Sequence, residues 1–171
     1  MVIDFETLEE TESVISGDEA FDFRDFQGES NTIACRLNVS VHRTGEINYV
    51  TVDIQGTIDT FCHKCLDPVK HRLETSFGLL VQRGGENRAE EYESSIDEYI
   101  YLPAGQRELS LDSYIYENLI VSLPIQILCT DDCKGLCTEC GVNLNSETCN
   151  CVRESDIRWS ALDKLKNKFN Q

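Results

Sequence analysis

The sequence of 171 residues contains no apolar run close to the roughly 20 residues that a membrane-spanning helix needs. Its opening residues, MVIDFETLEE, are acidic, and they lack the basic start and the apolar stretch of a secretory signal. These two absences predict a cytoplasmic protein with no membrane partner.

Basic residues are scarce. Against 31 Asp and Glu there are only 15 Lys and Arg, which gives a net charge of −16. A surface of that charge repels a phosphate backbone, so the composition excludes a generic basic nucleic-acid binder and favours a cationic partner. Residues 152–171 are the exception, because their bases outnumber their acids by two and the rest of the chain therefore carries −18.

Patterns typical of enzymes are also absent from the sequence. It has no Ser/His/Asp arrangement, no phosphate-binding glycine loop and no HExxH-like motif. Its many carboxylates provide no preferred pair for acid–base chemistry, and their runs are typical of solvated surface. We therefore expect a protein without enzymatic activity.

Apolar and polar residues alternate in several segments, as they do in half-buried β-strands. The period of two runs over residues 33–41 and returns over 50–54. A third strand is expected over residues 56–61 and a fourth over 69–81. These segments predict an antiparallel β-meander or a partly closed barrel, with one face buried.

One helix is predicted to cover that face. Ser110 is its expected N-cap, a stripe of Leu111, Ile115 and Leu119 is its apolar side, and Pro124 ends it. A second helix is expected from Asp156 to the end of the chain. The fold class is therefore α+β, with a cysteine-rich, zinc-binding C-terminal module and a terminal helix.

The chain is expected to have three parts. The first is an acidic N-terminal segment whose two ends pack on the body while its middle, around Ser16-Gly17-Asp18, is mobile. The parts are residues 1–30, the acidic segment; 31–124, a β-rich body with an acidic loop at 84–99 and the covering helix near 110–123; and 125–171, the zinc-binding module and C-terminal helix.

Cysteine is the residue that the sequence has in excess, with nine in all. Closely spaced thiols in a chain without an export signal bind metal more often than they form disulfides. Cys35 stands apart in a strand pattern, where it is expected to be a small buried apolar side chain. The other eight fall into four close pairs.

Two of these pairs predict a metal site in the C-terminal module. Cys137 and Cys140 have the spacing of a metal knuckle, and Gly141 permits the left-handed backbone that aims N–H groups at the sulfurs. Cys149 and Cys151 complete the four thiolates that a closed tetrahedral zinc site requires.

The remaining pairs, Cys62 with Cys65 and Cys129 with Cys133, predict a second site. The alternative grouping joins Cys62 and Cys65 to the Cys137 knuckle, and His63 is an alternative ligand. One or two zinc ions are expected, and iron is less favoured because nothing in the sequence indicates electron transfer. A site saturated by four thiolates has no open position for a substrate, so its expected role is structural.

Several of these motifs resemble the signatures of a known family. Cys62-x-x-Cys65-Leu66-Asp67-Pro68 resembles the first signature of the YceD-like family, the large ribosomal RNA subunit accumulation proteins of bacteria and plastids. The second signature is similar to Leu123-Pro124-Ile125 followed by Cys129-Thr130-Asp131-Asp132-Cys133-Lys134-Gly135-Leu136-Cys137, Cys140-Gly141, Asn143-Leu144-Asn145 and Cys149-x-Cys151. Asp156-Ile157-Arg158-Trp159 resembles the start of the closing helix of the family, in which proline commonly stands at the position of Ile157.

The resemblance implies a non-enzymatic ribosome biogenesis factor that is needed for the synthesis, processing or accumulation of large-subunit (23S) rRNA. Its implied partners are a large-subunit ribosomal protein, the pre-ribosomal particle, or both. Joined to the charge, this predicts an acidic adaptor for a basic ribosomal component, with an rRNA contact through Arg158, Lys164 and Lys168 of the C-terminal helix.

Two other functions stay open at the level of sequence. Zinc–thiolate clusters also serve as redox switches or redox-regulated chaperones, in which oxidation ejects the metal. A small regulator that binds nucleic acid through its zinc knuckle is the third hypothesis, and the net charge argues against it.

Overall fold

The computed structural model describes residues 1–8, 12–24, 30–85 and 98–152. The chain divides into two compact units, one of Met1–Phe61 with Pro68–Ile127 and the other of Cys62–Asp67 with Leu128–Gln171. The first unit contains the β-sheets and the helix described below, and the second contains the eight paired cysteines. The expected helix from Asp156 and most of the acidic loop, residues 86–97, lie outside the described residues.

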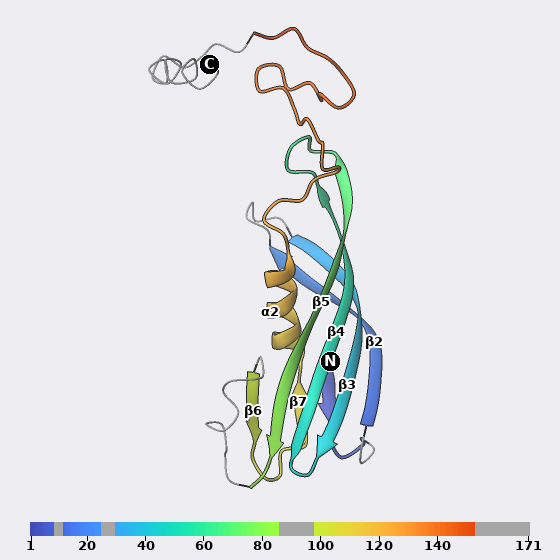
Figure 1. The fold of residues 1–171 in the computed structure, drawn as a ribbon, viewed down its shortest axis with the longest axis vertical. Helices are drawn as coiled ribbons and strands as arrows, with labels where there is room; N and C mark the ends of the chain where they lie inside the picture. The colour runs from blue at the N-terminus through green and yellow to red at the C-terminus, as the bar shows by residue number, and fades with distance from the viewer. Residues whose placement is uncertain (9–11, 25–29, 86–97, 153–171) are drawn as a thin grey trace, which may run out of the picture. The chain divides into compact units, whose positions relative to one another are not determined.

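The first unit is built on a five-stranded sheet in the order β2-β3-β4-β5-β6 (Figure 1). Strands β2 to β5 pair antiparallel with their neighbours, whereas β6 pairs parallel with β5. The strands are β2 (Glu12–Arg24), β3 (Ser30–Thr44), β4 (Ile47–Phe61), β5 (Pro68–Arg83) and β6 (Glu98–Leu102). The predicted meander is therefore confirmed, and no closed barrel forms within the described ranges.

The apolar residues that alternate in the sequence are the buried residues of the strands. Val50, Val52 and Ile54 of β4 are at most 1% exposed, and the residues between them are exposed. Cys35 on β3 is 5% exposed among the other inward residues, as predicted. A separate third strand over residues 56–61 is wrong, because β4 runs without a break from Ile47 to Phe61 and pairs with β5 along that length.

The described part of the N-terminal segment contains two β-strands, β1 (Val2–Asp4) and β2. The expected mobile middle is wrong: Ser16, Gly17 and Asp18 lie in β2 and pair with residues of β3. The acidic side chains are accommodated because β2 is an edge strand, and Asp18 forms an exposed ion pair with Arg36 (3.0 Å).

A small second sheet and one helix cover the buried face. Strand β1 (Val2–Asp4) pairs antiparallel with β7 (Glu108–Ser110), and helix α2 (Asp112–Ser122) follows β7 directly. Figure 1 shows α2 lying along β5, and Ile115 and Leu119 on α2 are fully buried. The sequence did not indicate the β1–β7 pair, because three residues are too few for a visible alternation.

The N-terminus of the helix differs from the prediction by one residue. Leu111 is the N-cap of α2 and makes no side-chain capping bond, while Ser110 belongs to β7 and its Oγ accepts a hydrogen bond from the Asp112 N–H (3.4 Å). Leu111 is fully buried, so packing on the core takes precedence over capping. Pro124 lies just beyond the end of the helix, as expected. No helix in the described part of the chain is long and apolar enough to cross a membrane.

Candidate metal centres

The two Cys-x-x-Cys motifs of the second unit fold into turns with the same backbone hydrogen bonds. In the first turn, the Leu66 N–H donates to the Cys62 carbonyl (2.9 Å) and the Cys62 N–H donates to the Asp67 carbonyl (2.8 Å). In the second, Gly141 donates to Cys137 (2.9 Å) and Cys137 donates to Val142 (2.8 Å). Each turn brings two sulfurs to one side, as a metal knuckle requires.

The residue after the second cysteine has a left-handed backbone in both turns. Gly141 has φ of +74°, as the motif predicted. In the first turn the equivalent residue is Leu66, with φ of +61°, and it is the one residue other than glycine with a positive φ in the described ranges. A side chain in this conformation costs about 1–2 kcal/mol, so the surrounding turn holds Leu66 against its preference.

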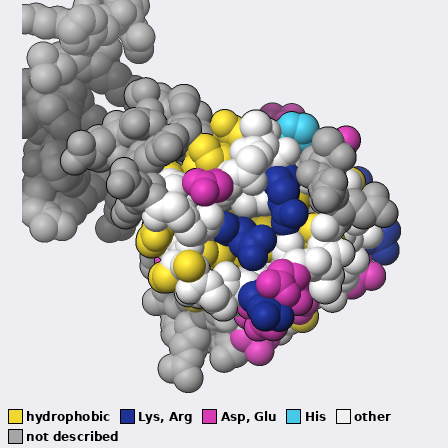
Figure 2. Space-filling model, turned by 90° about the horizontal axis from the view of Figure 1, so that it is seen from below, with side chains coloured by type: hydrophobic (Ala, Val, Ile, Leu, Met, Phe, Trp, Pro, Cys, Tyr) yellow, Lys and Arg dark blue, Asp and Glu magenta, His cyan; other side chains and the backbone are white. Residues whose placement is uncertain are grey.

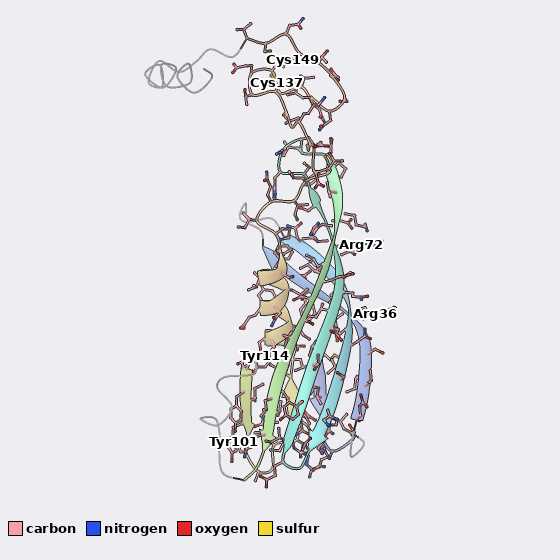
Figure 3. The ribbon with its side chains drawn as sticks, viewed as in Figure 1. Arg36, Arg72, Tyr101, Tyr114, Cys137 and Cys149 are labelled. Carbon is pink, nitrogen blue, oxygen red and sulfur yellow. The ribbon has the colours of Figure 1, made fainter. Side chains whose placement is uncertain are left out.

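The eight cysteines form two groups of four. Within each group the sulfurs lie within 4.8 Å of one another: Cys62, Cys65, Cys129 and Cys133 form the first cluster, and Cys137, Cys140, Cys149 and Cys151 form the second. In the first cluster the sulfur of Cys62 lies 3.7 Å from that of Cys133, and Cys65 lies 3.5 Å from Cys129. Figure 3 labels Cys137 and Cys149 of the second cluster. This is the grouping by sequence proximity, and all eight are free thiols.

The backbone of each knuckle stabilises one thiolate. Burial raises the pKa of Cys62, but N–H groups of Cys65, Lys64 and Cys129 donate to its sulfur and bring the pKa down to about 6. The N–H groups of Cys140 and Glu139 do the same for Cys137, whose pKa is also about 6.

The other cysteines of the clusters are mostly harder to ionise. Burial raises the pKa of Cys65 far above its usual range, and hydrogen bonding with Cys140 raises that of Cys151 to about 12. Each cluster therefore places a cysteine of low pKa beside cysteines of raised pKa, whose protons a divalent metal would displace.

Polar side chains from the second cluster's loop surround the first cluster. The Asn145 Nδ2 donates to the sulfur of Cys133 (3.3 Å), and this bond is the main cause that lowers the Cys133 pKa. The Asn143 Nδ2 donates to Asp67 Oδ2 (2.9 Å), which also accepts from the Cys65 thiol (3.2 Å). Outer contacts of this kind orient ligands around a metal.

The backbone of residues 135–136 also lies close to the backbone of the first Cys-x-x-Cys turn. The Leu136 N–H donates to the Lys64 carbonyl (3.0 Å), and Gly135, with φ of +77°, lies against that carbonyl. A Cβ at position 135 would be 3.0 Å from the Lys64 oxygen. Spacing alone did not reveal the roles of Gly135, Asn143 and Asn145, although all three lie in the Cys133–Cys149 interval.

The two clusters differ in exposure. Cys62, Cys65 and Cys133 are at most 5% exposed and Cys129 is half-buried. In the second cluster Cys140 and Cys151 are exposed, and the other two are half-buried. His63 is exposed and, in the part of the chain that the structure describes, no histidine belongs to either cluster.

The donor set fits zinc. Four thiols at one point, with outer hydrogen bonds to their sulfurs, are the ligands of a closed structural zinc site, which has no position for water or substrate. The binding of zinc by these eight cysteines remains a prediction. Fold and clusters together define the class: an acidic, mostly antiparallel β-sheet protein with two four-cysteine clusters that could each hold a metal ion.

The particular family follows from comparison with known proteins. The sequence profile of the family described as "Large ribosomal RNA subunit accumulation protein YceD" matches residues 50–166, which is more than half of the chain. This chain belongs to the YceD family, as its motifs predicted.

Three relatives show the extent of the similarity. The chloroplastic large ribosomal RNA subunit accumulation protein YCED homolog 1 of Arabidopsis thaliana is 30% identical over 141 residues, covering 69% of this chain and 44% of the relative. Its namesake in Zea mays is 23% identical over 122 residues, with 57% and 42% covered. An uncharacterized protein of Mycobacterium tuberculosis strain H37Rv is 29% identical over 134 residues, with 75% and 60% covered. The chain thus spans less than half of each plant relative, and no solved structure matches it.

Proposed function

We propose that this protein is a ribosome biogenesis factor that is needed for the accumulation of large-subunit rRNA and that performs no chemistry on its partners. The carrying observation is the family match over residues 50–166, which includes both cysteine clusters. The closed donor sets support a structural role for zinc in both clusters. The absence of enzymatic activity remains a prediction, as does the division of the chain at residues 30 and 124.

The mechanism we propose is that of an acidic adaptor that holds a basic component of the large subunit. Its support is strand β2, a 13-residue edge strand of the main sheet. Its outer edge pairs with no other described strand, and an extended peptide adds to such an edge through main-chain hydrogen bonds. β2 carries the acidic residues Glu12, Asp18, Glu19 and Asp22.

Charge favours a basic peptide on β2 over a second copy of the chain. Two acidic edges repel each other, whereas Lys and Arg on an incoming peptide pair with the acids of β2. The expected partner is therefore a basic large-subunit ribosomal protein, alone or within the pre-ribosomal particle. The further rRNA contact that the sequence predicted, through Arg158, Lys164 and Lys168, lies outside the described residues and is retained as a proposal.

The function is tested by depleting the protein from cells and quantifying both subunit rRNAs across a sucrose gradient. The proposal requires a selective loss of large-subunit rRNA, and equal amounts of the two subunits would reject it. The adaptor mechanism is tested by complementation with Glu12→Gln combined with Asp22→Asn on β2. The matched control neutralises two exposed acids of the central strands, Asp53→Asn on β4 with Glu74→Gln on β5. Equal complementation by both variants would reject the role of β2.

The redox-switch function has one observation in its favour, the exposure of Cys140 and Cys151. Mild peroxide would then release zinc from the second cluster and leave the buried first cluster loaded. Retention of all zinc, with unreacted thiols, would dismiss this alternative.

A further inference from the structure

A pocket lies at the end of the main sheet where the β3–β4 turn, the end of β5 and the loop after β6 meet. Its volume is about 320 Å³, and it is lined by Arg43, Glu46, Asn48, Arg83 and the segment 103–106. Figure 2 looks at the molecule from this end and shows Lys and Arg side chains gathered in the middle of the face, with Asp and Glu beside them. Two arginines in one pocket need an explanation in a chain of net charge −16.

Arg43 is held in place by neutral groups. Its Nε donates to Asn48 Oδ1 (3.2 Å), and its Nη2 donates to the Phe5 carbonyl (2.6 Å). Asn48 is 1% exposed and is itself fixed by a bond from its Nδ2 to the Val81 carbonyl (3.2 Å). A buried amide therefore positions the guanidinium, and neither of its two acceptors carries a charge.

Arg83 is positioned by the same phenylalanine. Its guanidinium carbon lies 5.5 Å from the centroid of the Phe5 ring, and its buried Nε has no hydrogen-bond partner within the described ranges. The ion pairs of the described residues include Arg36 and Arg107 but neither Arg43 nor Arg83. Among the described residues, neither pocket arginine is paired with a carboxylate, although acids outnumber bases two to one in the sequence.

The walls of the pocket leave room for a ligand near the backbone. Gly84 and Gly105 have φ of +65° and +100°, and a Cβ at either position would meet no atom within 4 Å. Glu46 is the one carboxylate of the lining, and it lies beside Gly85. The lining residues therefore carry a net positive charge.

We propose that this pocket binds a phosphate group of an RNA backbone, with Arg43 and Arg83 as the two guanidinium ligands. Guanidinium groups present paired donors that match phosphate oxygens, and fixing them in advance reduces the entropy lost on binding. The choice of RNA rests on the proposed function. One phosphate held at a defined point positions an RNA without coating it, which is compatible with the charge of the rest of the chain.

The test measures binding of the zinc-loaded full chain to a fluorescein-labelled single-stranded RNA 12-mer over a range of salt concentrations. Arg83→Gln is expected to weaken binding at least tenfold and to lower the salt slope by about 1. Arg83→Lys keeps the charge but loses the paired donors of the guanidinium. Its affinity is therefore expected to lie between those of the unmodified chain and Arg83→Gln. The control is Arg72→Gln, an exposed arginine toward the other end of β5 (Figure 3).

Two outcomes would overturn the proposal: equal affinity of Arg83→Gln and the unmodified chain, or equal loss in Arg72→Gln. A polyglutamate 12-mer is the second probe, and tight binding of it through the same arginines would replace RNA by an acidic protein. Unfolding midpoints of the variants separate lost binding from lost structure. Loss of RNA binding in Arg83→Gln combined with normal rRNA levels in depleted cells would reject the proposed function and leave the phosphate site standing.

Discussion

The side-chain amide of Asn145 donates a hydrogen bond to the sulfur of Cys133 at 3.3 Å, although Asn145 belongs to the loop between Cys140 and Cys149 of the second cluster. Its Oδ1 also accepts from the Lys134 N–H (2.8 Å). The loop of the second cluster therefore supports a cysteine of the first cluster.

Replacing Asn145 by Ala should weaken zinc binding at the first cluster, because the Cys133 thiolate loses its main stabilising donor. Outer-contact losses of this kind typically cost about 10- to 100-fold in metal affinity. Competition with a chromogenic chelator measures the change, and Asn150→Ala, an exposed position between Cys149 and Cys151, is the control. Unchanged affinity in Asn145→Ala would show that the contact is incidental.

The two knuckles allow a paired stability experiment. Leu66→Gly removes an unfavourable left-handed side chain that is 61% exposed, so it should raise the free energy of unfolding by about 0.5–1 kcal/mol. Gly141→Leu introduces the same strain and should lower it by about 1–2 kcal/mol. Both are measured by denaturant unfolding at one fixed zinc concentration, because bound metal shifts apparent stability. Changes of the same sign in the two variants would contradict the equivalence of the turns.

Zinc content should distinguish the clusters. Elemental analysis of the unmodified chain should give two zinc ions, and Cys133→Ser or Cys140→Ser should each give one. Cys35→Ala is the matched control, because that thiol is buried in the sheet unit and belongs to neither cluster. A loss of both ions in each single variant would show that the clusters load cooperatively, and zinc lost in Cys35→Ala would contradict the assignment.

Much of the fold could be predicted from the sequence, because burial repeats at the periods of its elements. The inward residues of β3, β4 and β5 alternate over long runs, and the stripe of Ile115 and Leu119 marks the helix. The β1–β7 pair is too short for such a signal. In β2, the acidic composition indicated solvent rather than the edge of a sheet, where acidic side chains also reach water.

The membership of the two cysteine clusters was predictable, since close spacing along the chain constrains where the sulfurs point. The residues that support the first cluster from the interval between Cys133 and Cys149 were not predictable from the sequence. Asn143, Asn145 and Gly135 act across the gap between distant segments, and only the folded chain brings them to Cys133, Asp67 and Lys64. The arginine pocket is similar, because Arg43 and Arg83 come from different strands and each is unremarkable in its own segment.

Alkylation of the metal-free chain should follow thiolate character rather than exposure. Cys137 is half-buried with a pKa of about 6, whereas Cys151 is exposed with a pKa of about 12. At pH 7 iodoacetamide should therefore modify Cys137 before Cys151, because the thiolate is the nucleophile.

The pH dependence of the alkylation rates should also follow the pKa values of the two thiols. The rate at Cys137 should rise through pH 6 and then level off, while the rate at Cys151 should keep rising above pH 9. Since the pKa of Cys137 is lower in the folded chain than in the unfolded one, its ionisation stabilises the fold fully above the unfolded value of about 9. That contribution declines as the pH falls toward 6. Peptide mass spectrometry at several pH values measures both rates, and faster modification of Cys151 at pH 7 would show that the knuckle N–H groups do not hold a thiolate before metal binds.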